Sequence, residues 1–183
     1  MTLGRLEQVL LERSVRRGEF TLASGLRSSY YIDCRLTTMS AEGLVLIGEA
    51  GLAAIRSAGW HPDAIGGLTM GADPVAYAVA ARSWADPPAI DAFSVRKEAK
   101  GHGTKRQVEG NFRKGCRVVV VEDVITTGGS ALQAYDVLAA AGGEILGVLA
   151  VVDREQGGRE AIEQRGINVV ALTTASGLGL ANS

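Results

Sequence analysis

Residues 117–132 constrain the fold more than any other stretch of this 183-residue sequence. The stretch begins with four consecutive valines at 118–121, and such a run of β-branched residues predicts a strand that is buried on both faces. An acidic pair, Glu122 and Asp123, follows, then a small, hydroxylated loop at 126–130, and then an alanine- and leucine-rich segment with helical spacing. A buried strand, a glycine-rich loop and a helix in this order indicate an α/β fold.

The loop after the valines has the chemistry of a sugar-phosphate pocket. Ligands of open α/β sheets bind beyond the carboxyl ends of the strands. The hydroxyls and backbone N–H groups of residues 126–130 suit a phosphate monoester at the start of a helix, and Gly128 and Gly129 allow a close approach. Glu122 and Asp123 can accept hydrogen bonds from two ribose hydroxyls. A plain structural turn is the alternative, since the stretch is neither a P-loop nor a G-x-G-x-x-G motif.

The composition is that of one globular domain. The chain is 46% hydrophobic and 21% charged, and its length suits a single domain over residues 1–183. A net charge of −1 gives no global field to attract nucleic acid or an anionic membrane. Two distant cysteines fit a reducing compartment, and no apolar run is long enough to span a membrane. We therefore expect a cytoplasmic protein that binds neither nucleic acid nor membrane.

Strand and helix patterns alternate along the chain. Leu3, Leu6, Leu10 and Leu11 mark the apolar side of a first helix. The alternation predicts right-handed βαβ units and a mostly parallel sheet that is covered by helices on both sides. The expected elements are a helix at 3–17, a hairpin at 20–33, a helix at 41–57, a strand at 64–69, a helix with Pro74 in its first turn, and strands at 89–95, 145–152 and 168–173.

A basic polar stretch occupies residues 96–117. It has eight basic and two acidic residues, a local charge of +6, and contains all four lysines of the chain. Long loops inside compact domains are typically functional or disordered, and a solvated charged loop is the plain alternative. Beside a phosphate pocket, the stretch predicts a mobile lid at about 96–114 that excludes water and neutralises a departing pyrophosphate.

Four sequence motifs resemble one enzyme family. The string V-V-V-V-E-D-V-I-T-T-G-G-S at 118–130 resembles the phosphoribosyl-pyrophosphate (PRPP) motif of the type I phosphoribosyltransferases. The string R-K-E-A-K-G-H-G at 96–103 resembles the catalytic loop of the orotate phosphoribosyltransferases, a family within that group. Residues 20–33 resemble the hood over the base in that family, and Val152-Asp153-Arg154 resembles the strand end that faces orotate. The matches occur in the expected order over nearly the whole chain.

The resemblance implies a type I phosphoribosyltransferase fold with a small N-terminal hood at about 1–40. It implies Mg²⁺-dependent transfer of a phosphoribosyl group from PRPP to orotate, giving orotidine 5′-monophosphate and pyrophosphate in de novo pyrimidine (UMP) biosynthesis. It also implies a homodimer in which each catalytic loop reaches into the neighbouring active site. Magnesium would be held mainly by substrate oxygens, with no direct protein ligands.

The resemblance also assigns roles to single residues. Lys100, His102 and Asp123 are the expected catalytic residues. Orotate is expected to contact Thr126 and Arg154, whose guanidinium fork suits a carboxylate. The expected PRPP-binding residues are Arg96, Lys97, Lys100, His102, Glu122, Asp123, Val124, Ile125, Thr126, Thr127, Gly128, Gly129 and Ser130. We also expect backbone N–H groups of residues 71–73 to contact pyrophosphate.

The sequence departs from the family at two positions. Many relatives have a lysine where this chain has Ala23, and one branch has a lysine in the loop that corresponds to 69–72. Two other functions remain open from the sequence. One is a phosphoribosyltransferase for another base, such as a purine, which the PRPP motif permits. The other is a non-catalytic regulator that binds RNA or a nucleotide, for which a basic face outside the loop is expected.

Overall fold

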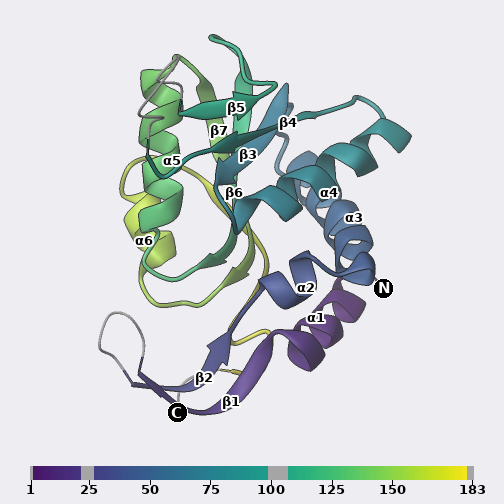
Figure 1. The fold of residues 1–183 in the computed structure, drawn as a ribbon, viewed down its shortest axis with the longest axis vertical. Helices are drawn as coiled ribbons and strands as arrows, with labels where there is room; N and C mark the ends of the chain where they lie inside the picture. The colour runs from purple at the N-terminus through teal and green to yellow at the C-terminus, as the bar shows by residue number, and fades with distance from the viewer. Residues whose placement is uncertain (1, 22–26, 99–106, 181–183) are drawn as a thin grey trace.

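A six-stranded sheet forms the centre of the structure, a computed structural model that describes residues 2–21, 27–98 and 107–180. The strand order is β5-β4-β3-β6-β7-β8, and every neighbouring pair is parallel except β4 and β5. The strands are β3 (Ala64–Leu68), β4 (Asp91–Val95), β5 (Val108–Gly110), β6 (Arg117–Ile125), β7 (Glu144–Asp153) and β8 (Val169–Thr174). The predicted mostly parallel sheet is therefore confirmed, with the valine strand β6 inside it (Figure 1).

Helices cover both faces of this sheet (Figure 1). One face carries α3 (Ala41–Ser57) and α4 (Ala72–Ala85), and the other carries α5 (Gly129–Ala140) and α6 (Gly158–Glu163). The valines of β6 explain the two layers, because successive strand side chains point to opposite faces. Val119 and Val121 belong to one hydrophobic cluster, and Val118 and Val120 to the other, all with no exposed surface. Burial on both faces is confirmed.

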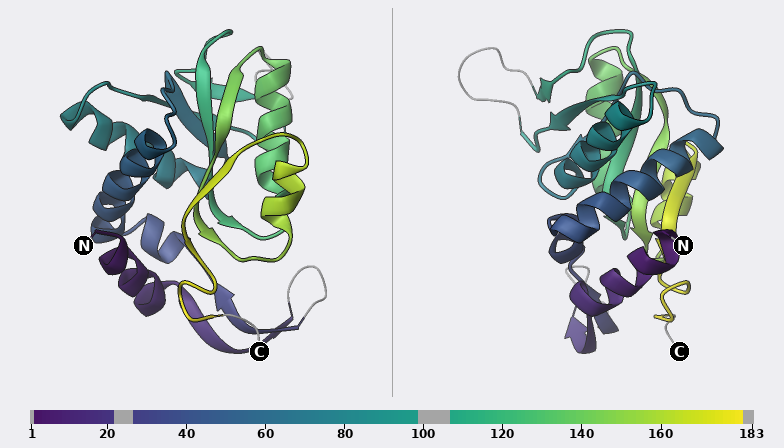
Figure 2. Two further views of the ribbon diagram at one scale, coloured as in Figure 1. Left: turned by 180° about the vertical axis from the view of Figure 1, so that it is seen from behind. Right: turned by 90° about the vertical axis from the view of Figure 1, so that its right-hand side faces the viewer.

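The N-terminal residues form the predicted hood beneath the sheet (Figures 1 and 2). It consists of α1 (Thr2–Arg13), an antiparallel pair of β1 (Val15–Thr21) and β2 (Arg27–Ile32), and the short helix α2 (Arg35–Thr38). The Thr173 hydroxyl donates to Glu7 Oε1 at 2.9 Å, which joins β8 to α1. The hood is therefore attached to the sheet from the last strand as well as through α3.

The first helix is shorter than predicted. It ends at Arg13, and residues 15–17 belong to β1, where Val15 pairs with Ile32. Leu3 and Leu11 are 47% and 38% exposed, whereas Val9 is fully buried. The leucine pattern ends at Leu11, and cross-strand pairing then outweighs the weak helical signal of the arginine-rich residues that follow.

Three short elements were not predicted. The strand β5 lies within the stretch expected to be a loop at 96–114, and α2 and α6 have only four and six residues. Segments this short carry too few residues to show a periodic pattern. The predicted helix at 41–57 is confirmed with the same bounds, and the turn of the hairpin lies outside the described residues.

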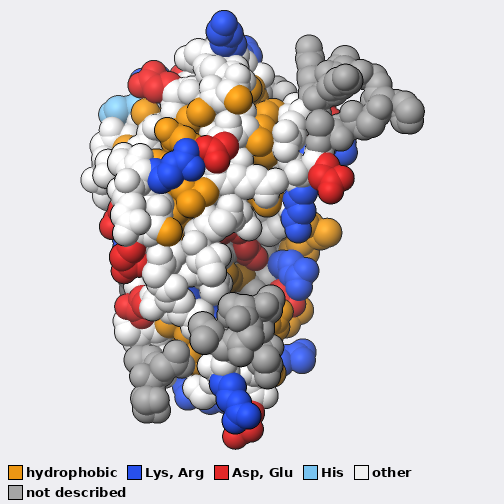
Figure 3. Space-filling view, turned by 90° about the vertical axis from the view of Figure 1, so that its left-hand side faces the viewer, with side chains coloured by type: hydrophobic (Ala, Val, Ile, Leu, Met, Phe, Trp, Pro, Cys, Tyr) orange, Lys and Arg blue, Asp and Glu red, His pale blue; other side chains and the backbone are white. Residues whose placement is uncertain are grey.

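Across the described ranges, no helix has both the length and the apolar character that crossing a bilayer requires. On the face shown in Figure 3, Lys and Arg side chains are interspersed with Asp and Glu side chains.

Gly66 gives a first testable prediction, on stability. A Cβ atom at Gly66 would overlap the Phe93 carbonyl oxygen on β4 and lie 2.6 Å from Phe93 Cδ2. We expect Gly66→Ala to lower the free energy of unfolding by about 1–3 kcal/mol, because overpacking forces β3 and β4 apart. The melting temperature should then fall by roughly 2–4 °C per kcal/mol in a chain of this size.

Thermal unfolding followed by circular dichroism measures this effect. The matched control is Gly4→Ala on α1, where an added Cβ meets nothing within 4 Å. The control should be neutral or stabilising by up to about 1 kcal/mol, because alanine favours a helix. Equal melting temperatures for Gly66→Ala and the wild type would contradict the packing argument.

Candidate active site

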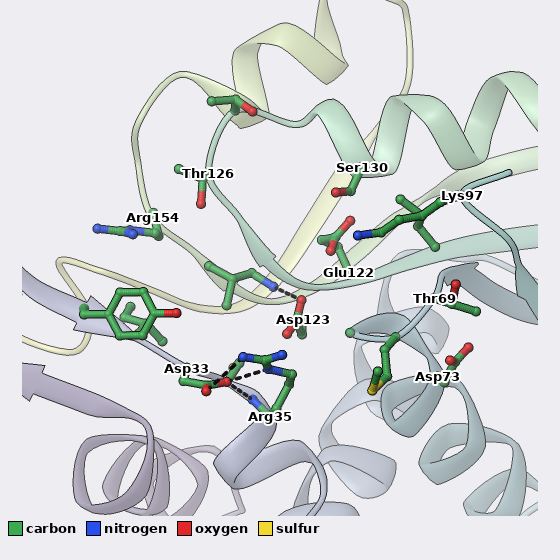
Figure 4. A pocket seen from close by; sticks show the side chains of 18 residues that line it. Asp33, Arg35, Thr69, Asp73, Lys97, Glu122, Asp123, Thr126, Ser130 and Arg154 are labelled. Carbon is green, nitrogen blue, oxygen red and sulfur yellow. Dashed lines mark hydrogen bonds and ion pairs between the residues drawn. The ribbon is translucent and has the colours of Figure 1, made fainter. Parts of the chain in front are cut away.

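A cavity of about 960 Å³ lies between the carboxyl ends of the strands and the hood. Its 18 lining residues come from five regions: β2 to α2, β3 to the start of α4, the residues after β4, β6 with the loop and helix start after it, and the residue after β7 (Figure 4). The charged members are Asp33, Arg35, Asp73, Lys97, Glu122, Asp123 and Arg154. The cavity therefore collects residues that lie more than 120 positions apart in the sequence.

The acidic pair lies at the end of β6 on the cavity wall. Glu122 is 8% exposed, and its Oε2 has no hydrogen-bond partner among the described residues. Asp123 Oδ1 accepts a hydrogen bond of 2.9 Å from the Val124 N–H. Burial, followed by the charge of Asp123, raises the pKa of Glu122 well above its usual range, and burial also raises the pKa of Asp123. The pair is thus short of donors, which two ribose hydroxyls would supply.

This burial leads to a second prediction. The pKa of Glu122 is higher in the folded chain than in the unfolded chain. At pH values between these two pKa values, Glu122 is protonated in the folded chain and ionised in the unfolded chain. Stability should therefore fall as the pH rises through that window. Glu122→Gln removes the titration, so we expect it to raise the melting temperature of the free protein at neutral pH and to change it less at pH 4.

Thermal melts at several pH values test this prediction. Glu12→Gln on the exposed side of α1 is the control and should change the melting temperature little at any pH. A Glu122→Gln effect that is the same at acidic and neutral pH would contradict a raised pKa as the cause.

The loop that is predicted to bind a phosphate connects β6 to α5. Thr126, Thr127 and Ser130 line the cavity, and Gly128 has a positive φ of 78° immediately before the helix begins. Figure 4 shows Ser130 at the helix start and Thr126 pointing into the cavity. Val124 also lines the cavity, whereas the Ile125 side chain is buried in the core, so any ligand contact at 125 involves its backbone. The loop offers hydroxyls and the positive end of α5 to one anion.

Arg154 lies at the end of β7, opposite the hood. It is 6% exposed, and its guanidinium carbon lies 4.9 Å from the centre of the Tyr30 ring. Its Nη2 donates to the Ser28 hydroxyl at a long 3.4 Å, and its Nε has no partner among the described residues. A buried guanidinium with unused donors is suited to a ligand carboxylate.

Only part of the predicted catalytic loop is described. Lys97 lines the cavity, and Figure 4 shows its side chain extending toward Glu122. The Arg96 side chain does not line the cavity, and its Nε lies 3.0 Å from Glu109 Oε1 on β5. Lys100 and His102 lie outside the described residues.

Several lining side chains were given no role by the sequence, which predicted only backbone contacts for residues 71–73. Asp33 and Arg35 follow the alternating pattern of β2, and Tyr31 is 40% exposed beside them. Asp73 accepts a 2.7 Å hydrogen bond from the Ser94 hydroxyl, and burial raises the pKa of Asp73. The sequence does show two charged residues, Asp33 and Arg35, shortly after Tyr30 and Tyr31. No local pattern, however, indicates that these charged side chains face β6.

Comparison with known sequences identifies the relatives of this chain. The phosphoribosyl transferase domain family matches residues 42–170. The orotate phosphoribosyltransferase of Aquifex aeolicus is 48% identical over 177 residues, which cover 95% of this chain and 96% of that protein.

Solved structures of orotate phosphoribosyltransferases are also similar to this chain. The orotate phosphoribosyltransferase of Mycobacterium tuberculosis H37Rv in complex with Fe(III) dicitrate is 43% identical and has a TM-score of 0.86, covering 98% of this chain and 100% of that one. A structure of the same enzyme in complex with PRPP has a TM-score of 0.82 at 40% identity, covering 98% of this chain and 100% of that one.

Proposed function

Because this chain belongs to the orotate phosphoribosyltransferase family, we propose that it transfers the phosphoribosyl group of PRPP to orotate. The products are orotidine 5′-monophosphate and pyrophosphate, and the reaction serves de novo pyrimidine biosynthesis in the cytoplasm. One observation carries the proposal: a single cavity joins an acidic pair, a phosphate loop and a buried arginine under a hood. The PRPP complex of a relative 40% identical supports the donor.

The residues of the cavity divide the substrates among them. Glu122 and Asp123 accept hydrogen bonds from the ribose 2′- and 3′-hydroxyls, and residues 126–130 hold the 5′-phosphate. Arg154 binds the orotate carboxylate through its free donors, with Thr126 beside it. These contacts fix the C1 atom of the ribose in front of the orotate ring nitrogen.

The chemical step needs no enzyme nucleophile. The orotate nitrogen forms a bond to C1 while the bond from C1 to the diphosphate oxygen breaks. The diphosphate leaves with the bonding electrons, and the proton carried by the orotate nitrogen is released to solvent. Positive charge develops on the ribose ring, and the carboxylate of Asp123 stabilises it from the neighbouring wall. The protein therefore acts by positioning and by charge stabilisation.

Magnesium fits the cavity as an ion that is held mainly by the substrate. Within the described residues, no group of three or more His, Cys, Asp or Glu side chains is placed to hold a metal. Asp73 and Asp123 nevertheless provide hard carboxylate oxygens on the wall, and Mg²⁺ often keeps its waters and binds substrate phosphates. When bound, the ion supplies charge neutralisation of the departing diphosphate.

The basic loop completes the site in our proposal. Arg96, Lys97, Lys100 and His102 engage the diphosphate, and in a homodimer the loop of one subunit reaches into the active site of the other. The resemblance of residues 96–103 to the catalytic loop of the family supports these roles.

A direct assay tests the reaction. Purified protein is mixed with orotate, PRPP and Mg²⁺, and the loss of orotate absorbance in the ultraviolet is followed. We expect metal-dependent loss with orotidine monophosphate as the product. Turnover of adenine or hypoxanthine instead of orotate would favour another base, and PRPP binding without any turnover would favour a regulator.

A further inference from the structure

Arg35 is a cationic side chain of the cavity to which neither the sequence nor the proposed reaction gives a role. It begins α2 and lies beneath Asp123 (Figure 4). Its Nε donates to Asp33 Oδ1 at 2.8 Å and its Nη2 to Asp33 Oδ2 at 3.1 Å. The backbone N–H of Arg35 also donates to Asp33 Oδ1, at 3.2 Å. The guanidinium is thus held on the cavity wall by a two-point contact.

This contact leaves most of the guanidinium free. A guanidinium has five N–H donors, and Asp33 takes two of them. The two donors of Nη1 and one of Nη2 have no acceptor among the described residues, and the side chain is 50% exposed. Asp33 already orients the guanidinium group of Arg35. Binding of an anion to this group therefore costs little side-chain entropy.

The place of Arg35 indicates which anion it meets. In the proposed reaction, the 5′-phosphate lies at residues 126–130 and the orotate carboxylate lies at Arg154. The diphosphate of PRPP therefore occupies the remaining wall, which residues 69–71 form together with Asp123. Gly71 lies directly against that carboxylate, since a Cβ on it would be 2.5 Å from Asp123 Oδ1. Arg35 lies below the same carboxylate and lines the same cavity (Figure 4).

The charges of this part of the cavity support the same assignment. Asp33, Asp73 and Asp123 are acidic, and the described cations beside them are Arg35 and Lys97. The chain has no lysine among residues 69–72. A diphosphate needs fixed positive charge, and a guanidinium fork matches the geometry of phosphate oxygens.

We propose that Arg35, oriented by Asp33, binds the diphosphate group of PRPP and of the product pyrophosphate. This inference rests on the proposed function. It assigns the hood a second task, because α2 then contributes a substrate contact as well as covering the base.

Binding measurements on separate ligands test the assignment. Isothermal titration calorimetry of Arg35→Ala with PRPP, with pyrophosphate and with ribose 5-phosphate, each with Mg²⁺, compares ligands that have and lack the diphosphate. We expect a loss of about 10- to 100-fold in affinity for PRPP and pyrophosphate, as for a lost hydrogen bond to a charged group. Affinity for ribose 5-phosphate should stay within about 2-fold of the wild type, the scatter of a site whose contacts are intact.

Two further variants sharpen the comparison. Arg35→Lys keeps the charge but not the fork and should lose less affinity for pyrophosphate than Arg35→Ala. Arg165→Ala is the matched control, because Arg165 also pairs with an aspartate, Asp136, at a similar exposure and does not line the cavity. The control should bind all three ligands like the wild type.

The outcomes separate this inference from the proposed function. An equal loss for ribose 5-phosphate and PRPP in Arg35→Ala would mean that Arg35 only supports the acidic pair or the hood, and would overturn the assignment. Unchanged pyrophosphate affinity would also overturn it. Wild-type protein that binds no PRPP would remove the proposed function itself, whereas PRPP binding without orotate turnover would leave the diphosphate contact testable by the same titrations.

Discussion

Replacing Arg154 with alanine is expected to lower kcat/KM for orotate by about 100- to 1,000-fold, the effect of truncating one member of a buried charged pair. The guanidinium is buried against Tyr30, and its unused Nε leaves a donor for the ligand. Loss of this group removes the counter-charge of the orotate carboxylate, so the effect should appear mainly for orotate. Steady-state kinetics with each substrate varied in turn measure it.

Two comparisons limit the interpretation of that result. Arg154→Lys keeps a charge without the fork and should be impaired less than the alanine variant. Calorimetry should give the same PRPP affinity for Arg154→Ala as for the wild type, because none of the proposed PRPP contacts involves Arg154. A matching loss of PRPP affinity would indicate that Arg154 acts by holding the hood, through Ser28 and Tyr30, instead of by binding orotate.

Lys100→Ala is expected to lower kcat by about 100- to 1,000-fold, the effect of losing one group that stabilises transition-state charge. Its affinity for PRPP should change much less, because the phosphate loop and the acidic pair remain. Single-turnover kinetics together with calorimetry separate the chemical step from binding. Lys114→Ala is the matched control, since Lys114 belongs to the same basic stretch but lies outside the R-K-E-A-K-G-H-G string.

Mixing the two impaired variants tests the shared loop. In a heterodimer of Lys100→Ala and Arg154→Ala subunits, one active site combines an intact pocket with an intact loop from its neighbour. Random pairing of subunits in a two-fold dimer predicts recovery of about a quarter of wild-type activity. No recovery after subunit exchange, shown to have occurred by a tag on one variant, would mean that each loop serves its own subunit.

The sequence alone determined the centre of the molecule. Four successive valines point alternately to the two faces of a strand, so both faces of that strand must be buried. A strand of this kind is typical of a parallel sheet with a helical layer on each side, and the local pattern therefore predicted this architecture. The acidic pair and the loop at 126–130 directly follow the valines in the sequence. The sequence therefore also predicted that both lie at the carboxyl end of this strand. The family resemblance depended on these same local strings.

Tertiary structure alone decided which distant residues share the cavity. Arg154 meets Tyr30 and Ser28 of the hood, and Arg35 reaches the wall of β6, because the hood folds back beneath the sheet. Neither contact leaves a local sequence pattern, since each depends on the register and packing of elements that are far apart in the chain. The early end of α1 has the same cause: Val15 is a strand residue because Ile32 lies opposite it.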